Sequence, residues 1–412
     1  MASFTAISEC RLCGYGDVVD FFELGEQALS GVFPKLNEPD PIAVPLTLCR
    51  CASCGLVQLR HSTNPEDMFT HDYGYRSNLN AAMAQHLKDL VTWSATRANL
   101  QKGDNVLDIG CNDGTLLGAY KDRGVDRFGI DPIVHKFSAD YPEDITVHEG
   151  FFTAETGKKV LSGRKMKIIT SIAMFYDLPD PDDFVKGIQN ALADDGLWVF
   201  EQSYLVNMLQ DNAFDSICHE HIEYWALAQI EPLLHRNGLK LYDGEINDTN
   251  GGSFRLAACH ANSDYSETDA IKEMRTHENE MALDTWIPYD DFKQRIFALS
   301  NETRALIEKL NAEGKRIYAY GASTKGNTLL QFYGLDHRQI IAAVEVNPEK
   351  YGHCTPGSRI PIIPEEDCLD EGIDYFLVLP WHFRANILSR AQKYRDRGVK
   401  FIFPLPHLEI VE

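Results

Sequence analysis

Residues 107–117 read LDIGCNDGTLL, and this stretch decides the fold of the central part of the chain. Asp108 stands near the end of a strand-like run, and Gly110 and Gly114 follow in the turn that leads into a helical pattern. Glycine permits a tight turn and lets the backbone approach a ligand closely. The stretch therefore predicts a strand, a ligand-binding loop and a helix.

A second acidic residue indicates that the ligand of this loop is a nucleoside. Asp131 in RFGIDP ends the next predicted strand, at the place where folds of this kind hold ribose hydroxyls. The loop reads GCNDG rather than GxGxxG, and its acidic Asp113 would repel a pyrophosphate. These features disfavour a dinucleotide and suit a cationic sulfonium cofactor.

Strand-like and helical runs alternate along most of the chain. A helical run at 78–98 precedes the loop, and a helix over 116–123, then strands in KIITSIAM and GLWVFEQS, follow it. A second set begins at residue 315 with RIYAYGAS, IIAAVEVNP and DYFLVLP. Such alternation is typical of parallel sheets covered by helices. We expect an α/β protein with a metal-binding module at 1–70, a Rossmann-like domain at 71–265, a helical connector at 266–314 and a second Rossmann-like domain at 315–412.

Composition excludes several classes of protein. The net charge of -22 over 412 residues argues against a nucleic-acid partner. No apolar run approaches the roughly 20 residues that span a bilayer, and the first residues do not resemble a secretory signal, so we expect no membrane association and a cytoplasmic location. The ten cysteines are then free thiols or metal ligands. The sequence carries no signal of oligomeric state.

Two CxxC pairs in the N-terminal segment predict a metal site. Cys10 and Cys13 form one pair, and Cys51 and Cys54 form the other, 37 residues further on. This spacing is typical of structural zinc, whose four thiolates close the coordination sphere. Cys49 is an alternative to Cys51, and buried apolar cysteines are the alternative to a metal.

The segment CHEHIEYW at 218–225 gathers titratable groups that suit proton transfer. Histidine accepts protons near neutral pH, and a glutamate beside it can fix its tautomer. Two alternatives remain for this cluster. It is a second metal site that includes His219 and His221, or its members are ordinary solvated or capping side chains.

Two further motifs contain residues suited to anion binding. YGASTKGNTLL at 320–330 predicts a strand, a turn and a helix start, where backbone N–H groups attract phosphate and Lys325 adds positive charge. A purely structural turn remains the alternative. NDTNGGSFR at 247–255 predicts a hairpin loop, from which Arg255 could reach a phosphate.

The order of these motifs resembles a known family. DIGCNDG resembles the first motif of class I methyltransferases, which use S-adenosylmethionine (SAM). The CxxC pairs, YGYRSNLN, DIGCNDGTLL, HEH, NDTNGGSFR and YGASTKGNTLL resemble, in the same order, the SAM-dependent sugar C-methyltransferases, which include the C3'-methylating enzymes of branched deoxysugars. The resemblance covers essentially the whole chain and implies C-methylation of a nucleoside-diphosphate 4-ketosugar through an enolate.

The resemblance also implies roles for individual residues. Residues expected around SAM are Asp108, Gly110, Asn112, Asp113, Gly114, Asp131, Phe151 and Phe152. Residues expected at the reacting centre are His221 as base, Glu220, Tyr75 with Tyr73 as its rival, Cys218 and Asp177. Residues expected around the sugar nucleotide are Ser323, Lys325, Asn327, Glu345, Asn347 and Arg255, with Lys350, Trp381 and His382 as weaker candidates.

The chain departs from the family pattern at two positions that face the sugar. Cys218 stands where the C3'-methylating enzymes have tyrosine, and Asp177 stands where histidine is expected. These two departures therefore leave open the identity of the sugar, the methylated carbon and the base. Methylation at oxygen or nitrogen, a redox enzyme using NAD, and a zinc-ribbon binding protein are the competing hypotheses.

Overall fold

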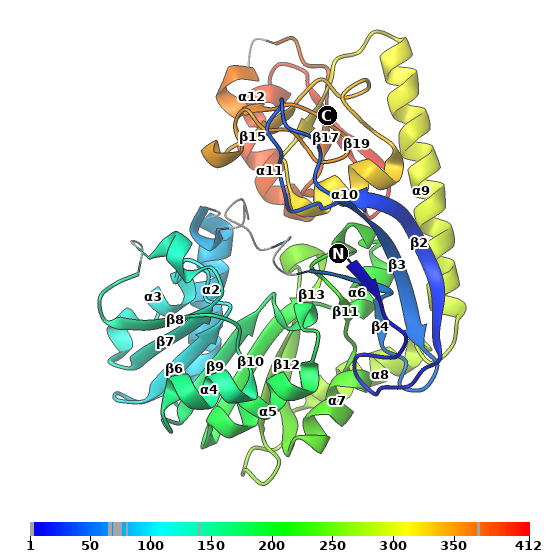
Figure 1. Ribbon diagram of the computed structural model, residues 1–412. Coiled ribbons are helices and arrows are strands. Elements are labelled where there is room, and N and C mark those ends of the chain that lie inside the picture. The colour runs from blue at the N-terminus through cyan, green and yellow to red at the C-terminus, as the bar shows by residue number, and fades with distance from the viewer. Residues whose placement is uncertain (1–3, 65–67, 69–75, 80, 139–140, 369–370) are drawn as a thin grey trace.

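The computed structural model describes residues 4–64, 68, 76–79, 81–138, 141–368 and 371–412. Its chain forms two α/β units with a smaller β-sheet beside them (Figure 1). Helix α9 (Ile287–Ala312) runs along one side of the molecule from the central unit to the C-terminal unit. No helix among the described residues is both long and apolar enough to cross a membrane.

The central unit is built on a seven-stranded sheet of order β12-β13-β10-β9-β6-β7-β8. Only β13 runs antiparallel to its neighbours in this sheet. The strands are β6 (Asn105–Ile109), β7 (Asp126–Asp131), β8 (Ile145–Glu149), β9 (Met166–Ile172), β10 (Leu192–Ser203), β12 (Leu239–Asn247) and β13 (Ser253–His260). β9 and most of β10 are buried on both faces, as expected for central strands covered on both sides.

Helices cover both faces of this sheet. On one face α2 (Ala81–Arg97) and α3 (Thr115–Gly118) share an apolar cluster with the sheet. The opposite face packs against α4 (Ala154–Leu161), α5 (Pro181–Ala191), α7 (Leu227–Arg236) and α8 (Asp269–Glu280). The expectation of one helix over 116–123 is wrong. Helix α3 stops at Gly118, and a separate 3₁₀ turn occupies Lys121–Arg123.

The N-terminal sheet has the order β11-β4-β3-β2 and takes its edge strand from the central unit. Its strands are β2 (Val18–Ala28), β3 (Ala43–Cys51), β4 (Val57–Leu59) and β11 (Glu223–Tyr224). A separate pair joins β1 (Phe4–Ala6) to β5 (His61–Thr63). The metal-binding module is therefore joined through a shared sheet to the segment that contains the HEH motif.

The C-terminal unit has a six-stranded sheet of order β16-β15-β14-β17-β18-β19, with only β19 antiparallel. Its strands are β14 (Ile317–Tyr320), β15 (Ala343–Glu345), β16 (Ile362–Pro364), β17 (Tyr375–Val378), β18 (Lys400–Phe403) and β19 (Glu409–Val411). Its helices are α10 (Thr324–Tyr333), α11 (Arg384–Arg390) and α12 (Gln392–Arg395). This order confirms the second Rossmann-like unit.

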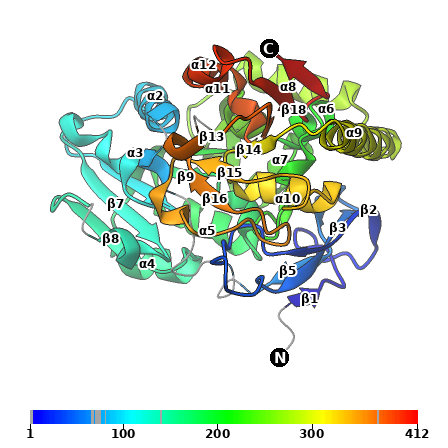
Figure 2. The ribbon, with the colours of Figure 1, turned by 90° about the horizontal axis from the view of Figure 1, so that it is seen from above.

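Seen from above, the C-terminal unit covers the middle of the molecule, with β7 and β8 to one side and β2 and β3 to the other (Figure 2). The segment between the two units is helical, as expected, and contains α8 and α9. α6 (Leu205–Gln210) packs against α9 near this junction. The carboxyl ends of the central strands thus face the C-terminal unit, which places the loops after β6, β7, β9 and β10 between the two units.

Candidate active site

A cavity of about 460 Å³ lies at the carboxyl ends of the central parallel strands. Such a position is where open α/β sheets bind their ligands. Its lining includes most of the residues expected around the cofactor, namely Asp108, Gly110, Asn112, Asp131, Phe151 and Phe152. Asp113 and Gly114 belong to the same loop but are not part of the lining.

Two glycines give the loop after β6 its shape. Gly110 and Gly114 have φ values of 76° and 75°, in the left-handed region that favours glycine. A Cβ atom at Gly114 would lie 2.8 Å from the ring of Tyr141. The loop therefore needs glycine at 114 for both conformation and space.

Asp131 organises the mouth of this loop from the end of β7. Its two carboxylate oxygens accept hydrogen bonds from the backbone N–H groups of Asn112 (2.9 Å) and Ile133 (2.8 Å). Burial raises the pKa of Asp131, although both hydrogen bonds oppose the shift. Each oxygen keeps a second lone pair, which is the chemistry that a pair of ribose hydroxyls requires.

The other two carboxylates of the motif have different partners. Asp108 is buried and accepts a 2.6 Å hydrogen bond from the hydroxyl of Thr170, and burial raises its pKa to about 7. Asp113 accepts from the backbone N–H groups of Asn78 and Thr115 and pairs with Arg76. Asp113 thus ties the segment before α2 to the loop.

The two phenylalanines after β8 lie in different surroundings. Phe151 is 55% exposed and lines the cavity, so one of its faces is free to stack on a base. Phe152 is buried and packs edge-on against Phe184, with ring centroids 5.2 Å apart. This geometry favours Phe151 as the contact for adenine.

The imidazole of His221 has a fixed tautomer. Its Nδ1 donates to the carbonyl oxygen of Ser216 at 2.8 Å, and its ring packs on Tyr176 with centroids 4.1 Å apart. Burial, and after it the charge of Lys325, lowers the pKa of His221 to about 3. The imidazole is therefore neutral, with Nε2 as the acceptor.

The groups around His221 form a buried cluster of weak acids. The thiol of Cys218 donates to Glu220, and burial raises the pKa of both groups. Asp177 lines the cavity, and burial together with Glu220 and Glu223 raises its pKa well above the usual range. Among the described residues, Oδ1 of Asp177 has no hydrogen-bond partner. Burial and the neighbouring carboxylates thus favour the neutral form of Asp177.

A second metal site in the HEH segment finds no support in the geometry. His219 turns its Nε2 to the carbonyl oxygen of Val44 at 3.1 Å, whereas His221 faces Ser216. Among the residues that the structure describes, the one group placed to hold a metal is formed by the four predicted cysteines. Tyr75 and its rival Tyr73 lie outside the described residues.

The four cysteines fit zinc. The sulfur atoms of Cys10 and Cys54 lie 3.6 Å apart, as do those of Cys13 and Cys51, and all four lie within 4.8 Å of one another. Four thiolates that each lie about 2.3 Å from one tetrahedral ion would have their sulfur atoms at about these distances from one another. Cys49 instead donates to the carbonyl oxygen of Gln58. Cys51 therefore belongs to the set and Cys49 does not.

The candidates from the C-terminal unit lie around the loop before α10. Lys325 donates to the carbonyl oxygen of Asn250, and burial lowers its pKa while Asp215 opposes the shift. Ser323 caps α10 by accepting from the N–H of Gly326 at 3.0 Å. Asn327 donates to Ser30 and lies in the interface with the N-terminal sheet. Of these three, Lys325 brings charge to the cleft.

Glu345 and Asn347 shape the loop that follows β15. Glu345 accepts from the backbone N–H groups of Ala322 (2.9 Å) and Asn347 (3.0 Å), and Asn347 caps the next turn. Lys350 donates to the carbonyl oxygen of Ala322 from above the ring of Phe33. These contacts hold the two loops together at the end of the C-terminal sheet.

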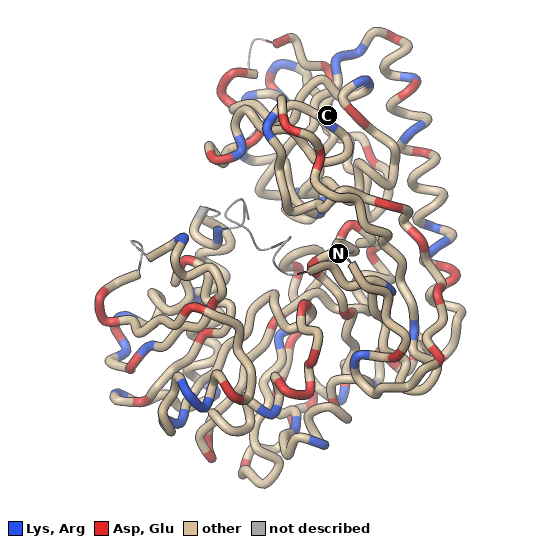
Figure 3. The backbone as a smooth tube through the Cα atoms, in the orientation of Figure 1, with Lys and Arg blue, Asp and Glu red and all other residues tan. Residues whose placement is uncertain are grey.

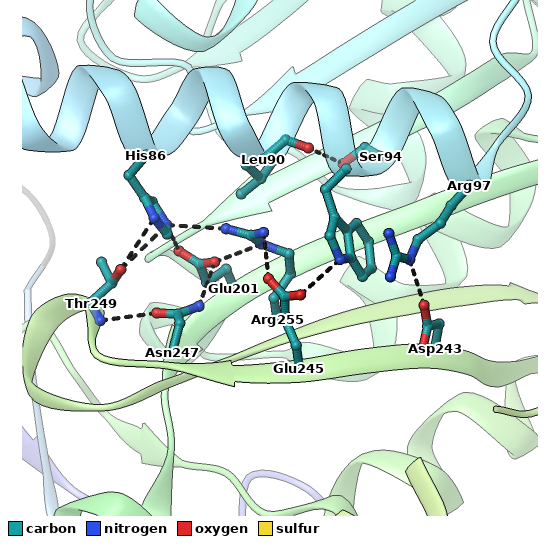
Figure 4. Close-up of polar contacts among 11 residues, drawn as sticks. His86, Leu90, Ser94, Arg97, Glu201, Asp243, Glu245, Asn247, Thr249 and Arg255 are labelled. Atoms are coloured by element: carbon teal, nitrogen blue, oxygen red, sulfur yellow. Dashed lines mark hydrogen bonds and ion pairs between the residues drawn. The ribbon is translucent and has the colours of Figure 1, made fainter. Parts of the chain in front are cut away.

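Arg255 lies in a polar network that reaches the cavity (Figure 4). Its guanidinium pairs with Glu201 at 2.8 Å and with Glu245 at 2.7 Å. Glu201 lines the cavity and also contacts His86 and Asn247. Two carboxylates thus engage Arg255, which is not directed at the C-terminal unit.

Sequence reasoning missed His86 and Glu201. Glu201 ends the predicted strand GLWVFEQS, so its place at the carboxyl end of a parallel strand was a usable signal. His86 carries no such signal, because nothing in a helical pattern tells which polar residue meets a strand end. Acidic and basic residues are spread along the backbone of both units (Figure 3), so the acidic excess does not single out this site.

Comparison with known proteins agrees with this site. A model described as "Methyltransferase domain" matches residues 75–243, "C-methyltransferase C-terminal domain" matches 248–406, and "Putative zinc binding domain" matches 10–69. The cavity, the loop after β6 and these matches define a SAM-dependent methyltransferase with a zinc-binding module.

The family follows from the full-length likeness. The chain is 31% identical to the C-methyltransferase NovU of Streptomyces niveus over 98% of its own length and 97% of that protein. It belongs to the C-methyltransferase family that the motifs indicated.

Two solved structures resemble less than half of the chain, and only loosely. Magnesium protoporphyrin IX methyltransferase from Synechocystis PCC 6803 with bound SAH has 15% identity, with 45% of this chain and 90% of that chain covered at a TM-score of 0.35. A putative methyltransferase in complex with the Haloferax volcanii Trm112 activator has 16% identity, with 45% and 99% covered at a TM-score of 0.34. Scores this low carry no conclusion about activity.

Proposed function

We propose that this C-methyltransferase acts on a nucleoside-diphosphate 4-keto-deoxysugar and methylates the carbon next to the ketone, at C3'. The observation that carries the proposal is the environment of His221, a neutral imidazole with Nε2 as its acceptor, whose pKa is lowered in part by the charge of Lys325 of the C-terminal unit and whose chain neighbour Ile222 lines the cavity. A base near both a methyl-donor site and a cation suits a substrate that is both a carbon acid and an anion.

The chemistry requires a base because a C–H group is not a nucleophile. Loss of the proton next to a ketone gives an enolate, whose carbon then attacks an electrophile. SAM supplies an electrophilic methyl group. The proton goes to Nε2 of His221, the new C–C bond forms as the methyl–sulfur bond breaks, and S-adenosylhomocysteine (SAH) leaves with the sulfur electron pair. Oxygen or nitrogen acceptors would need no such step.

Lys325 links substrate binding to the strength of the base. Burial, and after it the charge of Lys325, lowers the pKa of His221, so the free site holds a neutral but weak base. An anionic phosphate or enolate oxygen beside Lys325 would offset the second of these causes and make His221 more basic. The ammonium that attracts the substrate would thus weaken the base less when substrate is present.

Cys218 and Asp177 are proposed to select the sugar. Both belong to the buried cluster around Glu220, at positions where the related C3'-methylating enzymes have tyrosine and histidine. Their smaller side chains leave room and offer different hydrogen bonds. On the cofactor side, Asp131 is proposed to bind the ribose and Phe151 the adenine, with Glu345 and Asn347 beside the nucleotide of the sugar.

The test is incubation with ¹³C-methyl-labelled SAM and either dTDP-4-keto-6-deoxyglucose or UDP-4-keto-6-deoxyglucose. We expect carbon NMR of the product to show the label bonded to a ring carbon. A label on oxygen or nitrogen, or turnover of a sugar nucleotide that lacks the ketone, would contradict the proposal and favour the alternative acceptors.

A further inference from the structure

Cys10 of the zinc-binding set is connected to the HEH segment through a buried side chain, Gln58 of β4. Gln58 is 0% exposed and belongs to β4, the strand that pairs with β11. Its side-chain amide points to the loop that contains Cys10. Its Nε2 donates to the sulfur of Cys10 at 3.2 Å. A hydrogen bond to a ligand thiolate orients that ligand and tunes its charge.

The orientation of this amide is fixed by its other end. Oε1 of Gln58 accepts from the backbone N–H of Arg11 at 3.1 Å and from the guanidinium of Arg11 at 3.2 Å. Two donors at one end establish it as the oxygen, so the NH₂ group must face Cys10. The side chain therefore fits a deprotonated, metal-bound sulfur and would be poorly matched to a neutral thiol.

The backbone of Gln58 leads directly to the catalytic segment. Gln58 is paired with Glu223 in the antiparallel register of β4 and β11, and the N–H of Leu59 donates to the carbonyl oxygen of Ile222 at 2.9 Å. Ile222 lines the cavity and follows His221. From Cys10 to His221 the connection thus passes through one side chain and one short β-ladder.

A second branch runs from the same loop to the cavity wall. The guanidinium of Arg11 donates to the carbonyl oxygen of Leu59 at 2.7 Å and to the hydroxyl of Ser62 at 2.7 Å, and Ser62 lines the cavity. By contrast, the N–H groups of Asn112 and Gly110 in the loop after β6 donate to Asp131 and Ile130, and the segment at 76–78 donates to Asn112 and Asp113. None of these contacts involves Gln58 or Arg11.

We infer that Gln58 is a positioning residue that transmits zinc binding to residues 221–224. Bound zinc would then order this segment and leave the loop after β6 unaffected. Any effect of Gln58 on catalysis rests on the proposed role of His221. The effects of Gln58 on backbone order and on zinc retention do not, and both can be measured without substrate.

The experiment compares the wild-type chain with Gln58→Leu and with the matched control Gln27→Leu. Gln27 is a buried glutamine of β2 whose amide atoms have no partner among the described residues. Hydrogen exchange followed by mass spectrometry reports on peptides that cover 218–226 and 106–118. Release of zinc to a chromogenic chelator and SAH affinity by calorimetry are measured on the same samples.

For Gln58→Leu we expect zinc release about ten-fold faster or more, the scale found when a partner of a metal ligand is removed. Exchange in 218–226 should rise about ten-fold, while 106–118 and the SAH affinity stay as in the wild type. Gln27→Leu should behave like the wild type. Unchanged zinc release and exchange in Gln58→Leu, or equal loss of protection in both peptides, would overturn the inference.

Zinc removal from the wild-type protein gives the same test without a substitution, should Gln58→Leu fail to fold. After chelation we expect 218–226 to lose protection while SAH still binds. Loss of SAH binding together with that protection would show that zinc merely supports the whole fold. Neither outcome depends on which substrate the enzyme methylates, so failure here would leave the proposed function standing.

Discussion

The imidazole of His221 donates from Nδ1 to the carbonyl oxygen of Ser216 at 2.8 Å, and this bond leaves Nε2 as the only ring nitrogen that can accept a proton. Replacement by glutamine keeps a donor for Ser216 but removes the base. For His221→Gln we expect kcat to fall about 10²- to 10⁴-fold, the usual contribution of a general base. SAH affinity by calorimetry should not change, and a variant with nearly full kcat would contradict the assignment.

Gly114 should not tolerate a side chain. Its φ is 75°, and a Cβ would lie 2.8 Å from the ring of Tyr141. For Gly114→Ala we expect a cost of about 1–3 kcal/mol from the strained backbone, measured as a lower melting temperature and at least ten-fold weaker SAH binding. Gly118→Ala, in α3 with nothing within 4 Å of its added Cβ, is the control and should bind SAH normally.

Buried His219 predicts how stability depends on pH. Burial lowers its pKa from 6.5 to about 4, so below pH 6.5 the unfolded chain binds a proton that the folded chain does not. The contribution of His219 to stability should therefore be level above pH 6.5 and fall towards pH 4, by about 2 kcal/mol at pH 5. Denaturant unfolding of His219→Gln should show a shallower decline, and an identical slope would exclude His219 as a cause.

Lys325 should control binding of the sugar nucleotide but not of the cofactor. Loss of a charged hydrogen-bond donor costs about 1.5–3 kcal/mol, so Lys325→Met should bind UDP or dTDP at least ten-fold more weakly in calorimetry. SAH affinity should remain, and Lys309→Met on the exposed side of α9 serves as the control. If nucleoside diphosphates bind Lys325→Met normally while kcat falls, the ammonium acts on the enolate oxygen instead of on a phosphate.

The sequence predicts the cofactor half of this molecule better than the substrate half. Gly110, Gly114 and Asp131 belong to a local motif in which spacing determines the backbone path, so the loop and its cavity could be predicted. Glu201 and His86 meet across a strand and a helix 115 residues apart in sequence, and no local pattern encodes such a contact. The shared sheet between β4 and β11 was missed for the same reason.

Asn327 and Ser323, at the start of α10, show the same limit of prediction from local sequence. Asn327 and Ser323 stand in a motif typical of phosphate binding, yet Asn327 donates to Ser30 of the N-terminal segment and Ser323 caps α10. Sequence spacing predicts that such a helix start is well ordered. Which ligand the helix start faces depends on the packing of three parts of the chain, and that packing is a property of the tertiary structure.

The most direct test of the account is hydrogen exchange at the substrate carbon in the absence of methyl transfer. With SAH in the cofactor site and a nucleoside-diphosphate 4-ketosugar in D₂O, the account predicts that the enzyme washes deuterium into the position next to the ketone, and that His221→Gln does so at least 10²-fold more slowly. Methylation of a sugar by an enzyme that catalyses no such exchange under these conditions would contradict the enolate and the role of His221.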